Sequence, residues 1–183
     1  MEKHKTCSFF GHRNTEINLT FRQELKNIIE DLIVNYSVYT FLFGSRSSFD
    51  YVCHLVVSEL KEKYPYIKRI AYTCKHETCV LEKNLNKENK LYYQLGIKQI
   101  ALLSVEEEFC YKTKFISNIA SYIQRNQEMI NNSDYCIFYY NTSYKPEIRK
   151  KSKNSSYYQP KSGTAIAYQY AKRKQKIIIN TFK

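Results

Sequence analysis

The order of short apolar runs and longer amphipathic stretches constrains this chain more than any other feature of its sequence. The apolar runs predict strands over residues 6–11, 38–44, 67–73, 98–105, 135–141 and 176–180, and helical spacing predicts helices over 19–36, 49–64, 113–131 and 163–173. Strands that alternate with helices form βαβ units, in which the strands are parallel and both faces of the sheet are covered. The sequence therefore predicts an α/β fold: a single Rossmann-like three-layer domain with a mostly parallel sheet, spanning residues 1–183.

Two segments do not follow this alternation. Residues 74–96 are polar, and we expect helix only in their second half. Residues 142–161 predict a basic polar loop that is long for an ordered connection. We expect such a loop either to close over a bound ligand as a lid or to be disordered.

The composition is that of an ordinary globular protein. The 183 residues give room for one domain with a full core, and 43% of them are hydrophobic. We expect no signal peptide and no membrane partner, because no apolar run reaches the length of about 18 residues that a span requires. The six cysteines lack the spacing of a disulfide framework, which favours reduced thiols in a cytoplasmic protein.

Positive charge is concentrated near the C-terminus. The formal net charge is +12, and residues 145–176 contain ten Lys or Arg residues against one acid, Glu147. This excess favours an anionic partner such as a nucleotide, a nucleic acid or an acidic surface. A solvated basic loop explains the charge equally well, so the charge alone does not identify a binding site.

The first polar segment of interest, GHRNT, follows the first predicted strand. In open parallel sheets, ligands bind outside the carboxyl ends of the strands, where the strand order reverses. Gly11 permits a close backbone approach, and His12 and Arg13 can donate to a phosphate. A plain strand-to-loop turn is the alternative.

Two further segments open predicted helices. FGSRSSFD follows the second strand, with Gly44, Ser45 and Asp50 around the first turn of the next helix. The last predicted helix begins in a similar way, with Ser162, Gly163 and Thr164. The unpaired amides of a helix N-terminus attract anions. Serines that cap the helices, and small residues that let a helix pack closely on the sheet, are the alternatives.

The stretch RNQEMINNSD precedes the fifth predicted strand. Arg125 is a planar five-donor fork that suits a phosphate, and Asn126 can pair with a ribose or a base. Asp134 either accepts from a ribose hydroxyl or caps the turn into the strand. These residues complete a predicted ligand site at the strand ends.

In this order and spacing, the motifs resemble the SLOG superfamily, the SMF/DprA-LOG group of Rossmann-like domains. The motifs that carry this resemblance are a GHR turn, the Gly44-to-Asp50 turn, RNxxMxxxSD before a strand and SGT at the last helix. Within the superfamily, the YpsA-like branch is the most similar to this chain. The resemblance covers nearly the whole chain and implies binding of a nucleotide or nucleotide-derived ligand at the strand ends. In that superfamily some members sense NAD-derived signals, others cleave the N-glycosidic bond of nucleoside monophosphates, and a third branch binds single-stranded DNA.

The chain departs from the hydrolytic branch of that superfamily, whose sequence pattern is RKxxM followed by PGGxGTxxE. Arg125 and Met129 match the first motif, but the second places Ala167 where the glutamate belongs. Cleaving an N-glycosidic bond normally needs a carboxylate, and alanine cannot supply one. We therefore favour binding over catalysis, and Asp50 and Glu128 are the catalytic candidates if the chain is a nucleotide N-glycoside hydrolase.

A metal site, a cofactor site and a nucleic-acid site have less support in the sequence. Cys74, His76 and Cys79 form a CxHxxC cluster, but structural zinc needs four ligands, so no metal site is predicted. No cofactor is predicted either. Tyrosines beside the basic loop, such as Tyr144 and Tyr157, could stack the bases of a single strand, which makes nucleic acid the second candidate partner. The sequence leaves self-association open.

Overall fold

The computed structural model describes residues 4–13, 15, 17–44, 47–74, 107–111, 118–144 and 162–183. Their elements are β1 (Lys5–Gly11), α1 (Leu19–Tyr36), β2 (Val38–Phe43), α2 (Ser48–Lys63), β3 (Lys68–Cys74), β4 (Glu107–Tyr111), α4 (Asn118–Asn131), β5 (Tyr135–Tyr139), α5 (Gly163–Arg173) and β6 (Ile177–Asn180). The predicted strand over 98–105, most of the polar stretch 74–96 and residues 145–161 of the predicted loop lie outside these residues.

The six strands form one sheet in the order β4-β3-β2-β1-β5-β6, and all neighbours are parallel. From β1 the chain adds β2, β3 and β4 on one side, then crosses back to place β5 and β6 on the other. The strand order therefore reverses between β1 and β5. This confirms the α/β prediction and the parallel sheet.

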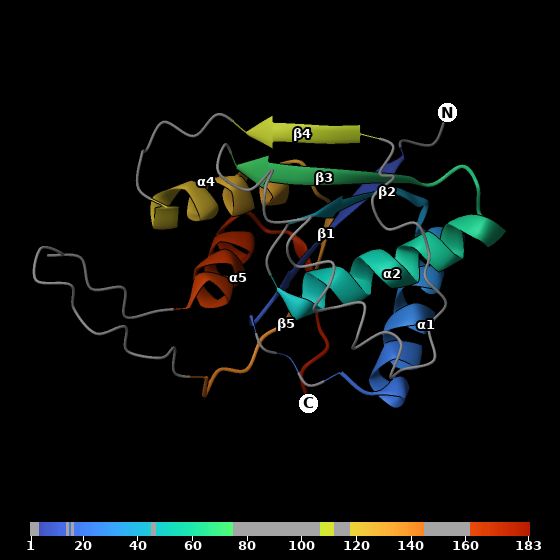
Figure 1. Ribbon diagram of the computed structural model, residues 1–183, viewed down its shortest axis with the longest axis horizontal. Coiled ribbons are helices and arrows are strands. Elements are labelled where there is room, and N and C mark those ends of the chain that lie inside the picture. Colours follow the sequence, from blue (N-terminus) through green and yellow to red (C-terminus); the bar gives the residue numbers. More distant parts are fainter. Residues whose placement is uncertain are drawn as a thin grey trace, which may run out of the picture.

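Helices cover both faces of the sheet (Figure 1), with α1 and α2 on one face and α4 and α5 on the other. Side chains of β1 alternate between the two faces, as the strand period requires. Phe9 packs with Phe41 beneath α1 and α2, and Phe10 packs with Phe138 beneath α4 and α5. The near-continuous apolar runs of the sequence reflect this burial on both sides.

The helix ends follow from local chemistry. Asn18 caps α1, its side-chain oxygen accepting from the Phe21 amide at 2.8 Å, and Ser37 ends that helix in the left-handed conformation with φ of 57°. Ser47 caps α2 by accepting from the Asp50 amide at 2.9 Å. That helix ends at Lys63, just before Pro65, as its sequence predicts.

One strand was not predicted from the sequence. Among the strands that the structure describes, β4, Glu107–Tyr111, pairs with β3 alone and forms one edge of the sheet, so it need not be apolar. Two glutamates in EEFCY hide it from a search for apolar runs. Among the helices that the structure describes, none combines the length and the hydropathy that a membrane crossing requires.

Three cysteines lie deep in the core. Cys7, Cys53 and Cys136 are free thiols and fully buried. Burial raises the pKa of each thiol, to about 11 for Cys136. These thiols therefore pack as small apolar side chains.

Gly11 is required by packing. A Cβ at this position would lie 2.3 Å from the Cβ of Phe49, which is completely buried at the start of α2. The glycine therefore lets α2 rest against the end of β1.

We expect Gly11→Ala to lower the free energy of unfolding by about 1–3 kcal/mol, because the added methyl overlaps Phe49. Gly163→Ala is the matched control, since a Cβ there meets no atom within 4 Å. The control should change stability by less than about 1 kcal/mol, and an increase is expected. Urea unfolding followed by circular dichroism measures both; equal effects of the two changes would contradict the packing role.

Candidate functional site

The carboxyl ends of β1 and β5 meet where the strand order reverses. The register places Gly11 opposite Tyr139, so His12 and Asn141 leave the sheet side by side. The Asn141 amide donates to His12 Nε2 at 3.1 Å. In open α/β sheets this is the position at which ligands bind.

His12 is enclosed by aromatic rings. It is 3% exposed, its ring stacks on Tyr144 with centroids 4.0 Å apart, and Tyr140 lies 5.9 Å away. Burial lowers the pKa of His12. The amide that donates to Nε2 also requires that nitrogen to be unprotonated, so His12 is neutral at physiological pH.

Arg13 and the loop that follows β1 are tied to the start of α2. The Arg13 carbonyl accepts from the Ser48 amide at 3.2 Å and from the Ser48 hydroxyl at 3.0 Å, and Ser48 Oγ accepts from the Thr15 amide at 3.0 Å. The Arg13 side chain is exposed. Its main chain is thus fixed while its guanidinium faces solvent.

Gly44, Asp50 and Arg125 come together at the end of β2. A Cβ on Gly44 would lie 2.8 Å from Asp50 Oδ2 and 3.1 Å from Arg125 Nη2, and the Gly44 amide donates to Asp50 Oδ1 at 3.3 Å. Both charged side chains are buried, with 8% of Asp50 and 5% of Arg125 exposed. Only glycine leaves room for them to meet here.

Arg125 is therefore held within the protein. Its Nη2 and Nε lie 3.1 and 3.3 Å from Asn126 Oδ1, and its guanidinium carbon lies 5.5 Å from the centre of the Tyr122 ring. The sequence predicts a fork for a ligand phosphate, and the structure shows this side chain buried beside Gly44. In this position Arg125 sets the local charge beside Gly44 and Asp50.

The start of α5 presents backbone donors. Ser162 caps the helix, its hydroxyl accepting from the Ala165 amide at 3.1 Å. The first intrahelical bond of α5 runs from the Ile166 amide to the Ser162 carbonyl, so the amides of Gly163 and Thr164 have no acceptor within the helix. One turn on, Tyr168 lies 4.7 Å from Tyr140, which links this helix to the end of β5.

Other predicted residues lie elsewhere. The Glu128 carboxylate accepts from Asn132 Nδ2 at 3.0 Å, towards the C-terminal end of α4 and away from the strand ends. Asp134 accepts from the Thr6 amide at 2.9 Å at the amino end of β1, so it caps the turn into β5 at the opposite end of the sheet from the strand-end residues. Ser45, His76 and Cys79 lie outside the described residues.

The sequence analysis did not identify Asn141. Its amide holds His12, its side-chain oxygen accepts from the Ser143 amide at 2.8 Å, and its carbonyl accepts from the Tyr144 amide at 3.2 Å. An asparagine directly after a buried strand signals such a turn. We define the strand-end site by the residues Gly11, His12, Arg13, Gly44, Asp50, Arg125, Asn126, Asn141, Ser162, Gly163 and Thr164.

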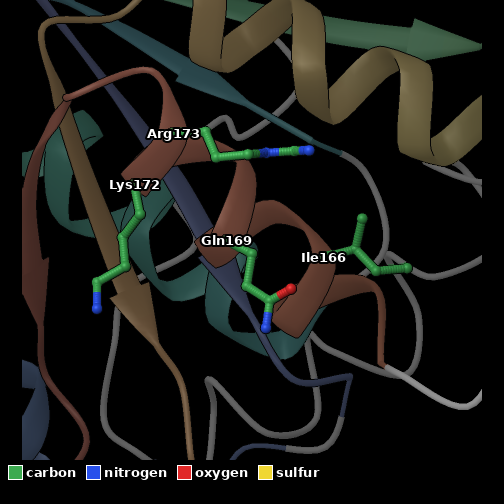
Figure 2. A pocket seen from close by; sticks show the side chains of 4 residues that line it. All are labelled: Ile166, Gln169, Lys172 and Arg173. Atoms are coloured by element: carbon green, nitrogen blue, oxygen red, sulfur yellow. The ribbon is translucent and has the colours of Figure 1, made fainter.

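A second feature lies on the outer surface of α5. Ile166, Gln169, Lys172 and Arg173 line an open hollow of about 520 Å³ (Figure 2), and Arg173 extends towards α4. None of these residues belongs to the strand-end site. Within the described ranges, no group of three His, Cys, Asp or Glu side chains could hold a metal ion.

We expect the crowding at Gly44 to appear in a double-mutant cycle. Gly44→Ala alone should destabilise the protein, because the methyl displaces Asp50 and Arg125. In an Arg125→Ala background the same change should cost less, with a coupling of about 0.5–2 kcal/mol. Urea unfolding of the four proteins measures this coupling, and strictly additive effects would contradict the contact.

Titration of His12 should make stability depend on pH. Because the pKa of His12 is lowered in the folded state, the unfolded chain takes up this proton first on acidification. The contribution of His12 to the free energy of unfolding is therefore greatest above about pH 6.5. It decreases as the pH drops through that value towards the folded pKa. His12→Gln should show a smaller loss of stability between about pH 7.5 and about pH 5; an unchanged loss would exclude His12 as its source.

Comparisons with known proteins agree with this architecture. A family model described as the YspA SLOG family (YpsA) matches residues 3–174. No curated protein matches the chain. DNA processing protein A from Helicobacter pylori, solved to study its binding of single-stranded DNA, has a similar fold with a TM-score of 0.52 at 14% identity; the match covers 95% of this chain and 63% of that protein. The family match confirms the resemblance predicted from the motifs, and the chain belongs to the YpsA SLOG family.

Proposed function

We propose that this protein binds a nucleotide or a nucleotide-derived molecule, such as an NAD-derived one, at the strand-end site, with a role as a sensor. The observation that carries the proposal is the His12–Asn141 contact at the reversal of strand order. The contact of Tyr168 with Tyr140 links α5, whose start is capped by Ser162, to the end of β5. Ligands of open α/β sheets bind at such reversals. Helix amides are suited to a phosphate.

The charge of the chain supports an anionic ligand. The net charge of +12 favours association with anions, and the exposed Arg13 guanidinium lies at the site itself. Arg125 adds a second, buried positive charge close to Gly44. A phosphate placed between Arg13 and the first amides of α5 would use the exposed donors without disturbing the buried ones.

Catalysis has less support than binding. Ala167, at the position of the hydrolytic glutamate, is 2% exposed and packs from α5 into the core between the sheet, α4 and α5. Glu128 is bonded away from the strand ends. Of the two carboxylate candidates, Asp50 is the one that lies at the strand-end site, where it is buried beside Arg125.

Single-stranded nucleic acid is the second candidate ligand. It is supported by the fold shared with a protein that binds single-stranded DNA. The basic hollow on α5, with Lys172 and Arg173, offers contacts for phosphates. Such binding should grow with strand length and weaken steeply with salt.

We expect a panel of mononucleotides, cyclic nucleotides and NAD to contain a ligand that raises the melting temperature. Arg13→Ala should weaken its binding by about tenfold, because a hydrogen bond to a charged group is lost. The apo protein should keep its stability, since the Arg13 side chain is exposed. Lys174→Ala is the matched control, because it removes one charge at the opposite end of α5.

Calorimetric titration and analysis of the products separate the alternatives. Saturation by one small ligand with no release of free base supports the proposal. Release of base would establish a hydrolase, and length-dependent binding of oligothymidylate alone would establish a single-strand binder. Equal losses of affinity in the Arg13 and Lys174 variants would place the ligand away from the strand-end site.

A further inference from the structure

His12 carries a hydrogen-bond donor that no described residue uses. Its Nε2 accepts from the Asn141 amide, so the single proton of the neutral ring resides on Nδ1. Nδ1 is buried and has no partner in the described part of the chain. A buried donor without an acceptor is costly, so an oxygen atom brought to this nitrogen would bind favourably.

The face of the same ring is covered by Tyr144. The two rings are stacked with an interplanar angle of 27° and a centroid separation of 4.0 Å. The turn from Asn141 to Tyr144 folds the tyrosine back over the histidine through the bonds from the Ser143 and Tyr144 amides. A flat aromatic ring is thus the shape that this face of His12 accommodates.

We propose that His12 recognises both the base and the sugar phosphate of the ligand, an inference that rests on the proposed nucleotide site. The base stacks on the imidazole in place of the Tyr144 ring, and a sugar or phosphate oxygen of the same ligand accepts from Nδ1. The Nδ1 proton points outward in the plane of the imidazole, so a ring stacked on the face cannot accept it. A nucleotide satisfies both demands, because it joins a flat base to an oxygen-rich sugar phosphate.

The lowered pKa of His12 agrees with this assignment. The neutral ring keeps the Asn141 bond at Nε2 and offers one donor at a fixed position. A protonated ring would lose that bond, since Nε2 would become a donor facing another donor. The turn that carries Tyr144 would then lose its anchor on β1.

The tautomer can be tested on the wild-type protein without a ligand. Two-bond proton–nitrogen spectra of histidine rings distinguish a protonated Nδ1 from a protonated Nε2, and His12→Gln assigns the signal. We expect His12 to be the neutral Nδ1-protonated form. A protonated Nε2 would overturn the inference while leaving the proposed nucleotide site intact.

Binding experiments test the two contacts separately. The probes are the common ribonucleoside 5′-monophosphates and ribose 5-phosphate, which lacks a base. We expect the best nucleotide to bind wild-type protein about tenfold more tightly than ribose 5-phosphate. The stacking of one base on an aromatic ring increases the affinity by about this factor. Tyr144→Ala should tighten the nucleotide by roughly fivefold and leave ribose 5-phosphate unchanged, since the competing ring is gone.

His12→Phe keeps a flat face but removes the donor. It should weaken the nucleotide and ribose 5-phosphate alike, by about tenfold, and preserve the preference for the nucleotide. Tyr66→Ala is the control for Tyr144→Ala, because it removes an exposed tyrosine at the far end of α2 and should change neither affinity.

The outcomes separate this inference from the proposed function. Nucleotide binding that is unaffected or weakened by Tyr144→Ala, or a wild-type protein without preference for a base, would overturn the stacking on His12 alone. No binding of any probe to the wild-type protein would overturn the proposed function and the inference with it.

Discussion

The pairing of β1 with β5 is the constraint on which the site depends. Asp134 fixes that register at the amino end, where its amide donates to the Thr6 carbonyl at 2.8 Å and its carboxylate accepts from the Thr6 amide. At the carboxyl end of the same two strands, this register brings His12 next to Asn141. A slip of one residue would turn every side chain of β5 to the opposite face and would separate these two residues.

The polar groups at the carboxyl ends of the strands are of two kinds. Some are hydrogen-bonded to other residues of the protein, and others can bind a ligand. Ser48 bonds to the main chain of Arg13 and Thr15, Asp50 accepts from the Gly44 amide, and Arg125 donates to Asn126. Among the described residues, the donors without a partner include the Gly163 and Thr164 amides at the start of α5, the Arg13 guanidinium and His12 Nδ1. Donors that are already in position lower the entropic cost of binding.

Much of the fold could be predicted from the sequence, because a buried parallel sheet requires apolar strands and amphipathic crossovers. β4 could not, since an edge strand need not be apolar and Glu107 and Glu108 conceal it. The strand-end residues were predicted from a general rule about parallel sheets. The burial of Arg125 could not be predicted, because it depends on how closely α4 approaches the end of β2. Similarly, the sequence indicates a turn at Gly11 but does not show that Phe49 fills the space beside it.

The three core cysteines offer a natural probe of how this sheet opens. Their raised pKa values leave almost no thiolate at neutral pH, and no reagent can reach sulfur atoms enclosed on both sides of β1. Alkylation of Cys7, Cys53 and Cys136 therefore requires the layers to part. Mass-resolved labelling of these three positions would report cooperative opening of the two helical layers without any engineered reporter.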